Sequence, residues 1–227
     1  MEMSNPLIVL CSGISTLLPF LAGIFIFKHS IQQYKRSIFL WVFFALAALV
    51  EAVLFILGTK SEQSAWIFHV YTLIEYVLIA IILADWQNKI ALARLTRLSI
   101  LVFILIFALM KFSSLENFSA VTHNYITRPL AVLLLSTFAF LTLQNLWSRT
   151  PARLTADYRF WMLLAMALYY SASLALFAFM FTKDQQTLIA LFKIHAVVNI
   201  LHNILFTIGV FKLRGAKQGA LQPEPAS

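Results

Sequence analysis

The stretch Ser37–Gly58 decides the fold: it reads SIFLWVFFALAALVEAVLFILG and contains a single ionisable side chain, Glu51. A helix needs about 20 consecutive apolar residues to cross the hydrocarbon core of a bilayer. A run of this length and composition is therefore typical of a transmembrane helix.

The rest of the chain has the composition of a membrane protein. Of its 227 residues, 61% are hydrophobic and only 11% are charged, and the mean hydropathy is +0.86. Soluble domains carry about 25% charged residues, so this chain cannot cover a water-facing surface with polar side chains. The apolar content excludes intrinsic disorder, and the single Cys11 excludes a disulfide scaffold within the chain.

Six further stretches resemble the first in length and composition, and none alternates in the manner of a transmembrane β-strand. We therefore predict an all-α fold, an integral membrane seven-helix bundle over residues 1–214. The predicted helices cover residues 7–27, 37–58, 65–84, 98–114, 129–147, 160–181 and 187–211. Residues 215–227 are predicted to form a disordered cytoplasmic tail.

The basic residues predict the orientation, because cytoplasmic loops carry the excess of Lys and Arg. Twelve of the 17 basic residues fall on the side that holds the C-terminus, and Lys193 lies inside the last helix. The four on the other side are Lys60, Lys111, Arg128 and Lys183. We expect the N-terminus outside and the C-terminus in the cytoplasm of a bacterial inner membrane. We interpret the net charge of +8 as a signal for orientation and for contact with lipid headgroups. We expect no nucleic-acid partner.

Ionisable side chains inside apolar helices are costly and by default indicate function. Glu75 lies near the middle of the third predicted helix, with His69 and Thr72 on adjoining faces, and we expect all three to point into the bundle. No basic residue lies at the depth of Glu75 on its own helix, so we expect this carboxyl to be uncharged unless His195 or His202 is close enough to take its proton.

The last predicted helix carries the densest polar set. His195, Asn199 and His202 share one face by their i, i+4, i+7 spacing, and Asn203 lies beside them. This set is suited to a ligand site, a proton relay or a metal, and equally to hydrogen bonds between helices. The ligand-binding or proton-relay candidates are Glu51, His69, Thr72, Glu75, Tyr170, His195, Asn199, His202 and Asn203.

We expect no cofactor. Were a metal present, His69, Glu75, His195 and His202 would be ligands of types that zinc accepts, and we expect these four side chains to share one cavity. Membrane metallohydrolases of the ceramidase and adiponectin-receptor type also have two histidines in the last helix, but with His-xxx-His spacing. Retinal on Lys193 is disfavoured, because this lysine projects away from the His195 face.

Three stretches together resemble a large group of seven-helix membrane proteins of Bacteroidota-type bacteria that have no established activity. They are Phe68-His-Val-Tyr-Thr-Leu-Ile-Glu75, Phe160-Trp161 followed by Tyr169-Tyr170-Ser171, and Ile194-His195 leading to Asn199. The resemblance implies the seven-helix architecture and emphasises His69, Glu75, His195 and Asn199. Because such proteins often accompany sensor histidine kinases, it also implies an accessory role in signalling.

We therefore expect a receptor-like sensor or small-molecule binding protein without enzymatic activity, whose basic cytoplasmic face contacts a cytoplasmic or membrane signalling partner. One alternative is a metal-dependent intramembrane hydrolase. A second is a transporter or proton-coupled carrier, which Glu51 and Glu75 favour and the lack of an internal repeat disfavours.

Overall fold

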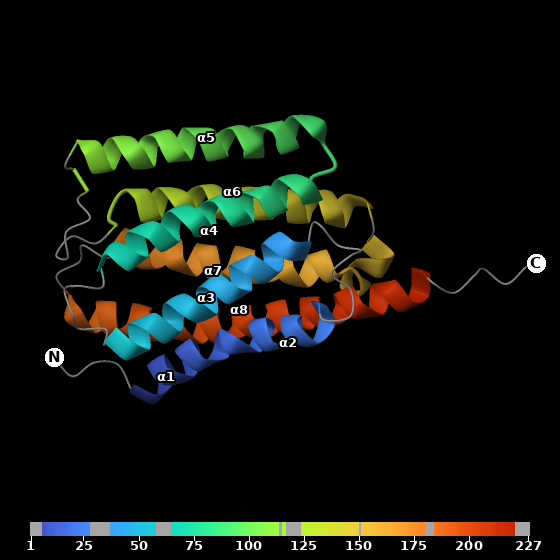
Figure 1. Cartoon of the computed structure of the whole chain (residues 1–227), viewed down its shortest axis with the longest axis horizontal. Coiled ribbons are helices and arrows are strands. Elements are labelled where there is room, and N and C mark those ends of the chain that lie inside the picture. The colour runs from blue at the N-terminus through green and yellow to red at the C-terminus, as the bar shows by residue number, and fades with distance from the viewer. Residues whose placement is uncertain are drawn as a thin grey trace, which may run out of the picture.

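The computed structural model describes residues 6–27, 37–57, 65–113, 115–116, 124–149, 151–179 and 184–220, and no strand occurs among them. The helices are α1 (Pro6–Ser15), α2 (Leu17–Phe27), α3 (Ser37–Leu57), α4 (Ala65–Trp86), α5 (Ile90–Phe112), α6 (Thr127–Arg149), the short 3-10 helix η3 (Pro151–Ala156), α7 (Tyr158–Phe179) and α8 (Gln185–Ala220). Figure 1 shows the long helices running side by side in one bundle.

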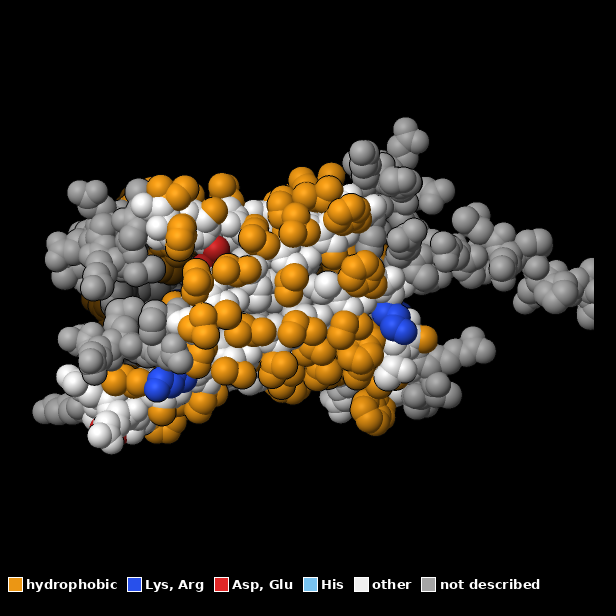
Figure 2. All heavy atoms as spheres, turned by 90° about the horizontal axis from the view of Figure 1, so that it is seen from below, with side chains coloured by type: hydrophobic (Ala, Val, Ile, Leu, Met, Phe, Trp, Pro, Cys, Tyr) orange, Lys and Arg blue, Asp and Glu red, His pale blue; other side chains and the backbone are white. Residues whose placement is uncertain are grey.

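The described part of the chain contains seven spans that are long and apolar enough to cross a membrane, with α1 and α2 together forming the first. Large apolar side chains cover the outside, including Phe25, Leu105 and Phe211. Figure 2 shows one such apolar face, with an acidic side chain visible among the apolar ones. The chain is therefore a multi-pass membrane protein.

The interior of the bundle is formed mainly by α4, α6 and α7. Tyr76, Leu135 and Met166 on these helices are almost completely buried. α5 lies at one edge, against α4 and α6, and α8 packs along α7, α1 and α2 (Figure 1). We call the end of the bundle where α5 ends and α6 and α8 begin the Asp184 end, and the opposite end the Lys89 end.

Two helices, α5 and α8, extend beyond their predicted limits by more than two residues. α5 begins at Ile90 rather than at residue 98, because Arg94 and Arg97 are accommodated at its start with exposed side chains. The Arg97 guanidinium lies 3.1 Å from the Asp85 carboxylate, as expected for a long basic side chain that reaches the interface. α8 continues to Ala220, so the predicted disordered tail begins in a helix, and residues 221–227 lie outside the described residues.

The first span is interrupted at Thr16. Pro19 has no backbone N–H, so the helical hydrogen bond to the Ser15 carbonyl cannot form. The chain makes a tighter turn instead, in which the Thr16 amide donates to the Gly13 carbonyl at 3.2 Å. The Ser15 and Thr16 hydroxyls donate to the Ser12 and Gly13 carbonyls at 2.6 and 2.7 Å. This break places a polar patch of α1 against α8.

Candidate ligand-binding cavity

A cavity of about 640 Å³ lies between α1, α2, α3, α4, α7, α8 and the start of α6. Its wall is mostly apolar, with a few polar side chains that converge from different helices. Three phenylalanines from α3 and α8 close its floor towards the Lys89 end: the Phe206 ring centroid lies 5.1 Å from that of Phe44 and 6.0 Å from that of Phe43. The cavity therefore occupies the half of the bundle towards the Asp184 end.

An ion pair between Arg128 and Glu75 lies in the cavity wall. The Arg128 guanidinium, at the start of α6, donates to the Glu75 carboxylate of α4. The Tyr170 hydroxyl of α7 donates to the other oxygen of this carboxylate at 3.2 Å, and Arg128 also lies over the Tyr71 ring at 5.8 Å. Glu75 therefore has a charged partner on another helix. The expectation of an uncharged carboxyl assumed that no basic residue lies beside Glu75, and Arg128 does lie there.

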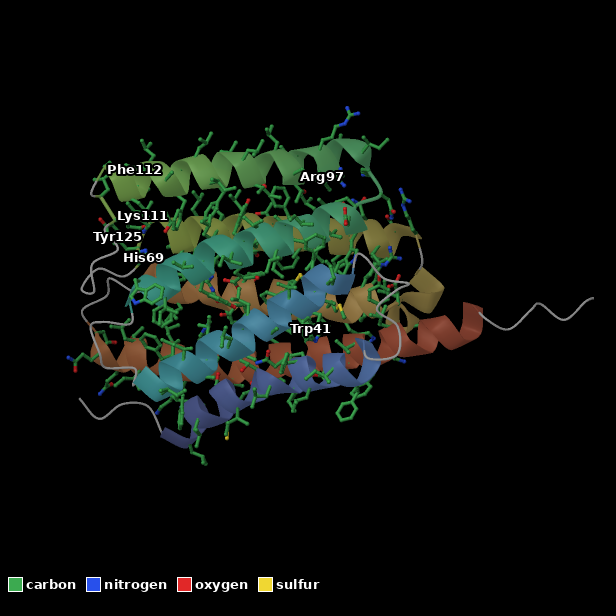
Figure 3. All side chains as sticks on the ribbon, viewed as in Figure 1. Trp41, His69, Arg97, Lys111, Phe112 and Tyr125 are labelled. Atoms are coloured by element: carbon green, nitrogen blue, oxygen red, sulfur yellow. The ribbon has the colours of Figure 1, made fainter. Side chains whose placement is uncertain are left out.

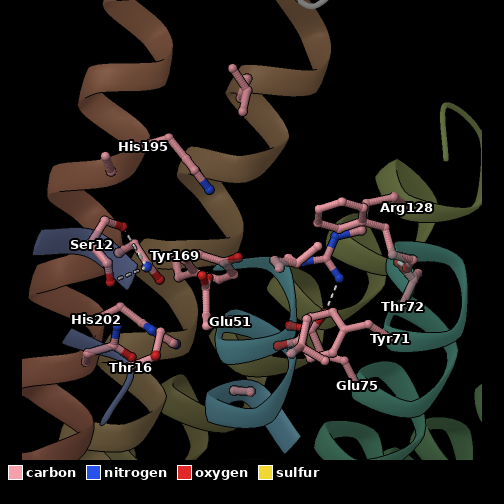
Figure 4. A pocket seen from close by; sticks show the side chains of 18 of the residues that line it. Ser12, Thr16, Glu51, Tyr71, Thr72, Glu75, Arg128, Tyr169, His195 and His202 are labelled. Atoms are coloured by element: carbon pink, nitrogen blue, oxygen red, sulfur yellow. Dashed lines mark hydrogen bonds and ion pairs between the residues drawn. The ribbon is translucent and has the colours of Figure 1, made fainter. Parts of the chain in front are cut away.

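Glu51 lines the same cavity from α3. Its carboxyl lies against α1 at Gly13, where an added methyl group would sit 3.4 Å from Oε2. Among the described residues, no ion pair or hydrogen bond to the Glu51 side chain is present. Figure 4 shows Glu51 beside Tyr169, between the Arg128–Glu75 pair and the two histidines of α8.

His195 and His202 contribute the α8 side of the cavity, where Tyr169 of α7 holds both rings. Tyr169 stacks on His202 with ring centroids 4.6 Å apart and lies 5.3 Å from His195. The buried Nδ1 atoms of both histidines have no hydrogen-bond partner within the described part of the chain. Since buried polar atoms are usually paired, these two nitrogens are available to a ligand.

Asn199 and Asn203 line the cavity but also join α8 to α1. The Asn199 amide donates to the Ser12 hydroxyl at 2.9 Å, and the Asn203 amide donates to the Ser15 hydroxyl at 2.8 Å. Two roles were predicted for the polar face of α8, ligand binding and hydrogen bonds between helices, and different residues along the helix have them. The asparagines make contacts between helices, and the histidines present nitrogens that lack a partner.

Thr72 and Asn124 form the cavity wall next to Arg128. The Asn124 amide nitrogen donates to the Phe68 carbonyl and to the Thr72 hydroxyl, both at 3.0 Å. The Phe68 carbonyl can only accept, which fixes the orientation of the amide. As a result, the buried Asn124 Oδ1 has no partner among the described residues.

His69 lies elsewhere, and the expected cluster of His69 with Glu75, His195 and His202 is wrong. The His69 Nδ1 atom contacts the Lys111 ammonium of α5, and His69 does not line the cavity. Figure 3 shows His69 near Lys111 and Tyr125 at the Asp184 end. Two helical turns on, the Tyr76 hydroxyl donates to Ser99 of α5 at 2.8 Å. The polar surface of α4 is therefore divided between α5 and the cavity.

Glu116 is the centre of this second polar cluster, and its side chain is fully buried. It accepts hydrogen bonds from the Thr127 hydroxyl at 2.6 Å, the Thr127 amide at 3.0 Å and the Lys111 ammonium at 3.1 Å. Burial opposes ionisation of this carboxyl, but the bonds from Thr127, the Ile126 amide and Lys111 outweigh it and lower its pKa from the ordinary value of 4.5.

The remaining cofactor expectations concern zinc and retinal. Among the described residues, no three His, Cys, Asp or Glu side chains lie close enough to hold a metal ion. Of the predicted zinc set, His69 lies outside the cavity, and Glu75, His195 and His202 line it without lying close enough together to hold a metal. Lys193 is exposed and does not line the cavity.

The sequence did not identify several cavity residues, above all Arg128, Tyr169 and Asn124. Arg128 was assigned to a loop because it directly precedes a predicted helix. Two signals could have paired it with Glu75. A buried acid needs a counter-charge, and Arg128 is a basic residue at the start of a nearby helix. Asn124 precedes the apolar run and had no such signal.

No protein-family model matches this chain, and no curated protein or solved structure matches it significantly. The proposal of ligand binding therefore depends on the cavity.

Proposed function

We propose that this protein is a receptor-like membrane protein that binds a small molecule in the cavity between α3, α4, α7 and α8. Its volume of about 640 Å³ is within the range of about 300–1,000 Å³ typical of ligand pockets. A mostly apolar wall with a few convergent polar groups is also typical of such pockets.

The observation that carries this proposal is the set of unpaired polar atoms on the cavity wall. Asn124 and His202 are each more than 90% buried, yet Asn124 Oδ1 and His202 Nδ1 have no partner within the described residues. A buried polar atom without a hydrogen bond costs about 1–3 kcal/mol. A bound molecule that supplies these bonds removes that cost.

The proposed setting is a bacterial inner membrane, with the cavity towards the outside. This orientation follows from the excess of basic residues on the Lys89 side of the sequence. The resemblance to proteins that accompany sensor kinases supports a signalling partner at the cytoplasmic face. In this proposal, ligand occupancy is detected from outside and passed to that partner through the helices of the cavity wall.

A proton-coupled carrier is the second candidate, because two carboxyls, Glu51 and Glu75, line one cavity. Phe43, Phe44 and Phe206 close the floor, so a carrier would have to separate these rings during transport. The intramembrane hydrolase receives no support from the side-chain geometry of the described residues.

The binding proposal is tested by filling the cavity. Ala196 lines it and is buried, so Ala196→Trp and the milder Ala196→Leu should reduce its volume. Wild type and both variants would be purified in detergent and extracted, and the bound small molecules measured by mass spectrometry. We expect a compound in wild-type extracts that is lost from the variant extracts.

The matched control is Val102→Trp, because Val102 is exposed on α5. This variant should retain the compound at the wild-type level. If folded Ala196→Trp and Ala196→Leu proteins both retain everything that wild type retains, the cavity does not bind ligand and the proposal is wrong. Proteoliposome flux that accompanies binding would support the carrier instead.

A further inference from the structure

The side-chain amide donors of the cavity are engaged by the protein itself. Asn199 and Asn203 donate to Ser12 and Ser15 of α1. The Asn124 amide nitrogen donates to Phe68 and Thr72. These side-chain amide donors bond within the protein rather than pointing at a ligand.

The polar atoms that stay unpaired are acceptors or can become acceptors. Asn124 Oδ1 can only accept, and so can an ionised Glu51 carboxyl. A neutral imidazole presents Nδ1 as an acceptor when its proton lies on Nε2, so His195 and His202 can also accept a hydrogen bond at this atom. All four side chains lack a partner at these atoms among the described residues. The cavity is therefore suited to a ligand that donates hydrogen bonds.

The formal charges lead to the same chemistry. The cavity lining contains two carboxyls, Glu51 and Glu75, and one guanidinium, Arg128. Glu75 neutralises Arg128 in a direct ion pair, which leaves Glu51 without a counter-charge. A carboxylate within the apolar layer needs a partner cation or a proton, and an anionic ligand would add a second uncompensated negative charge to this lining.

From these contacts we infer that the cavity binds an amphipathic organic amine, with its ammonium group at Glu51 and its apolar body along the phenylalanine-lined wall. This inference rests on the proposed function and names the ligand class. The ammonium donates to Glu51 and supplies the missing positive charge. Phe44, Phe177 and Phe192 provide the apolar contact for the body.

The experiment uses three probes of equal chain length: decylamine, decanol and decanoate. Each is titrated into the full-length protein in a non-ionic detergent, and the unfolding temperature is measured for wild type, Glu51→Gln and Asp85→Asn. Asp85 is the matched control, because it pairs with Arg97 at the Lys89 end and does not line the cavity. Each probe also partitions into the detergent micelles. This partition is the same for all variants, so its effect cancels when the variants are compared.

We expect decylamine to raise the unfolding temperature of wild type and Asp85→Asn equally. Glu51→Gln should bind it about tenfold more weakly or worse, since a charge-assisted hydrogen bond contributes roughly 1.5–3 kcal/mol. Decanol should bind equally weakly to all three proteins. Decanoate should stabilise none of them.

Two results would overturn the assignment. One is equal stabilisation of wild type and Glu51→Gln by decylamine. The other is stabilisation by decanoate, or stabilisation by decanol as strong as that by decylamine, that Ala196→Trp abolishes, which would keep the binding cavity but refute the amine. If no probe acts through the cavity and Ala196→Trp changes no bound compound, the proposed function fails as well.

Discussion

Glu75 and Arg128 form a buried ion pair, whose side chains are 1% and 13% exposed. Removing charges from water is costly, and each partner offsets this cost for the other. The Tyr170 hydroxyl adds a hydrogen bond to the carboxylate at 3.2 Å. Loss of either charge therefore leaves the other one buried without compensation.

The first prediction concerns this pair. Glu75→Gln and Arg128→Met should each reduce the free energy of unfolding by about 3–5 kcal/mol, because each leaves a single buried charge. The double variant Glu75→Gln/Arg128→Met should recover a substantial part of that loss. Thermal unfolding in detergent measures all three, with the exposed Thr137→Ala as control. Additive losses in the double variant would contradict the coupling.

At the scale of elements, α4 separates two polar clusters. Tyr71 and Glu75 line the cavity, whereas His69 and Tyr76 contact α5. The helical periodicity placed these side chains on adjoining faces, as the structure has them. It could not show that different helices cover the two faces, because the neighbours of α4 depend on packing between segments far apart in the sequence.

The ends of the helices were also predicted less well than their apolar centres. Apolar runs predicted all seven spans, because each one is long enough to cross a bilayer. The start of α5 was missed because Arg94 and Arg97 read as loop charges, although their long side chains allow them to occupy the first turns of a helix. Arg128 was missed as a cavity residue for a related reason: its charge was used only to set the orientation.

The second prediction concerns Glu116, which ties the end of α5 to the start of α6. Its pKa is lower in the folded protein than the ordinary value of 4.5, so its stabilisation is fully present above about pH 4.5. It is lost as the pH falls through the lower pKa of the folded state. The stability difference between wild type and Glu116→Gln should therefore be constant near neutral pH and shrink below about pH 4.5.

Unfolding temperatures of both proteins between pH 7 and pH 3 provide the measurement. Asp85→Asn is the control, because it removes a half-exposed carboxylate at the opposite end of the bundle. If the difference in unfolding temperature between wild type and Glu116→Gln stays the same at pH 3, the carboxylate charge does not hold α5 to α6.

At the scale of the whole molecule, the distribution of basic residues is the basis of the proposed orientation of the bundle. The proposed arrangement places the Asp184 end and the cavity outside the cell and the end of α8 in the cytoplasm. The apolar belt of the seven spans is compatible with either direction. The orientation therefore rests on the basic residues alone.

The third prediction tests that orientation. A reporter enzyme that works only outside the cytoplasm should be active when fused after Lys60, Asn117 or Lys183, three positions outside the described residues. It should be silent when fused after Ala220, where α8 ends. Activity of the Ala220 fusion, with silence of the other three, would reverse the bundle and place the cavity towards the cytoplasm.

The length of α8 has a mechanical consequence. Its 36 residues form a rod of about 54 Å at 1.5 Å per residue, whereas the hydrocarbon core is about 30 Å thick. One continuous helix carries His195 and His202 in the cavity wall and extends past its neighbours to Ala220 (Figure 1). With His202 as the pivot, a tilt of about 10° swings the Ala220 backbone through about 5 Å, close to one helical turn. A small rotation beside the cavity thus becomes a turn-sized displacement at the far tip of the rod.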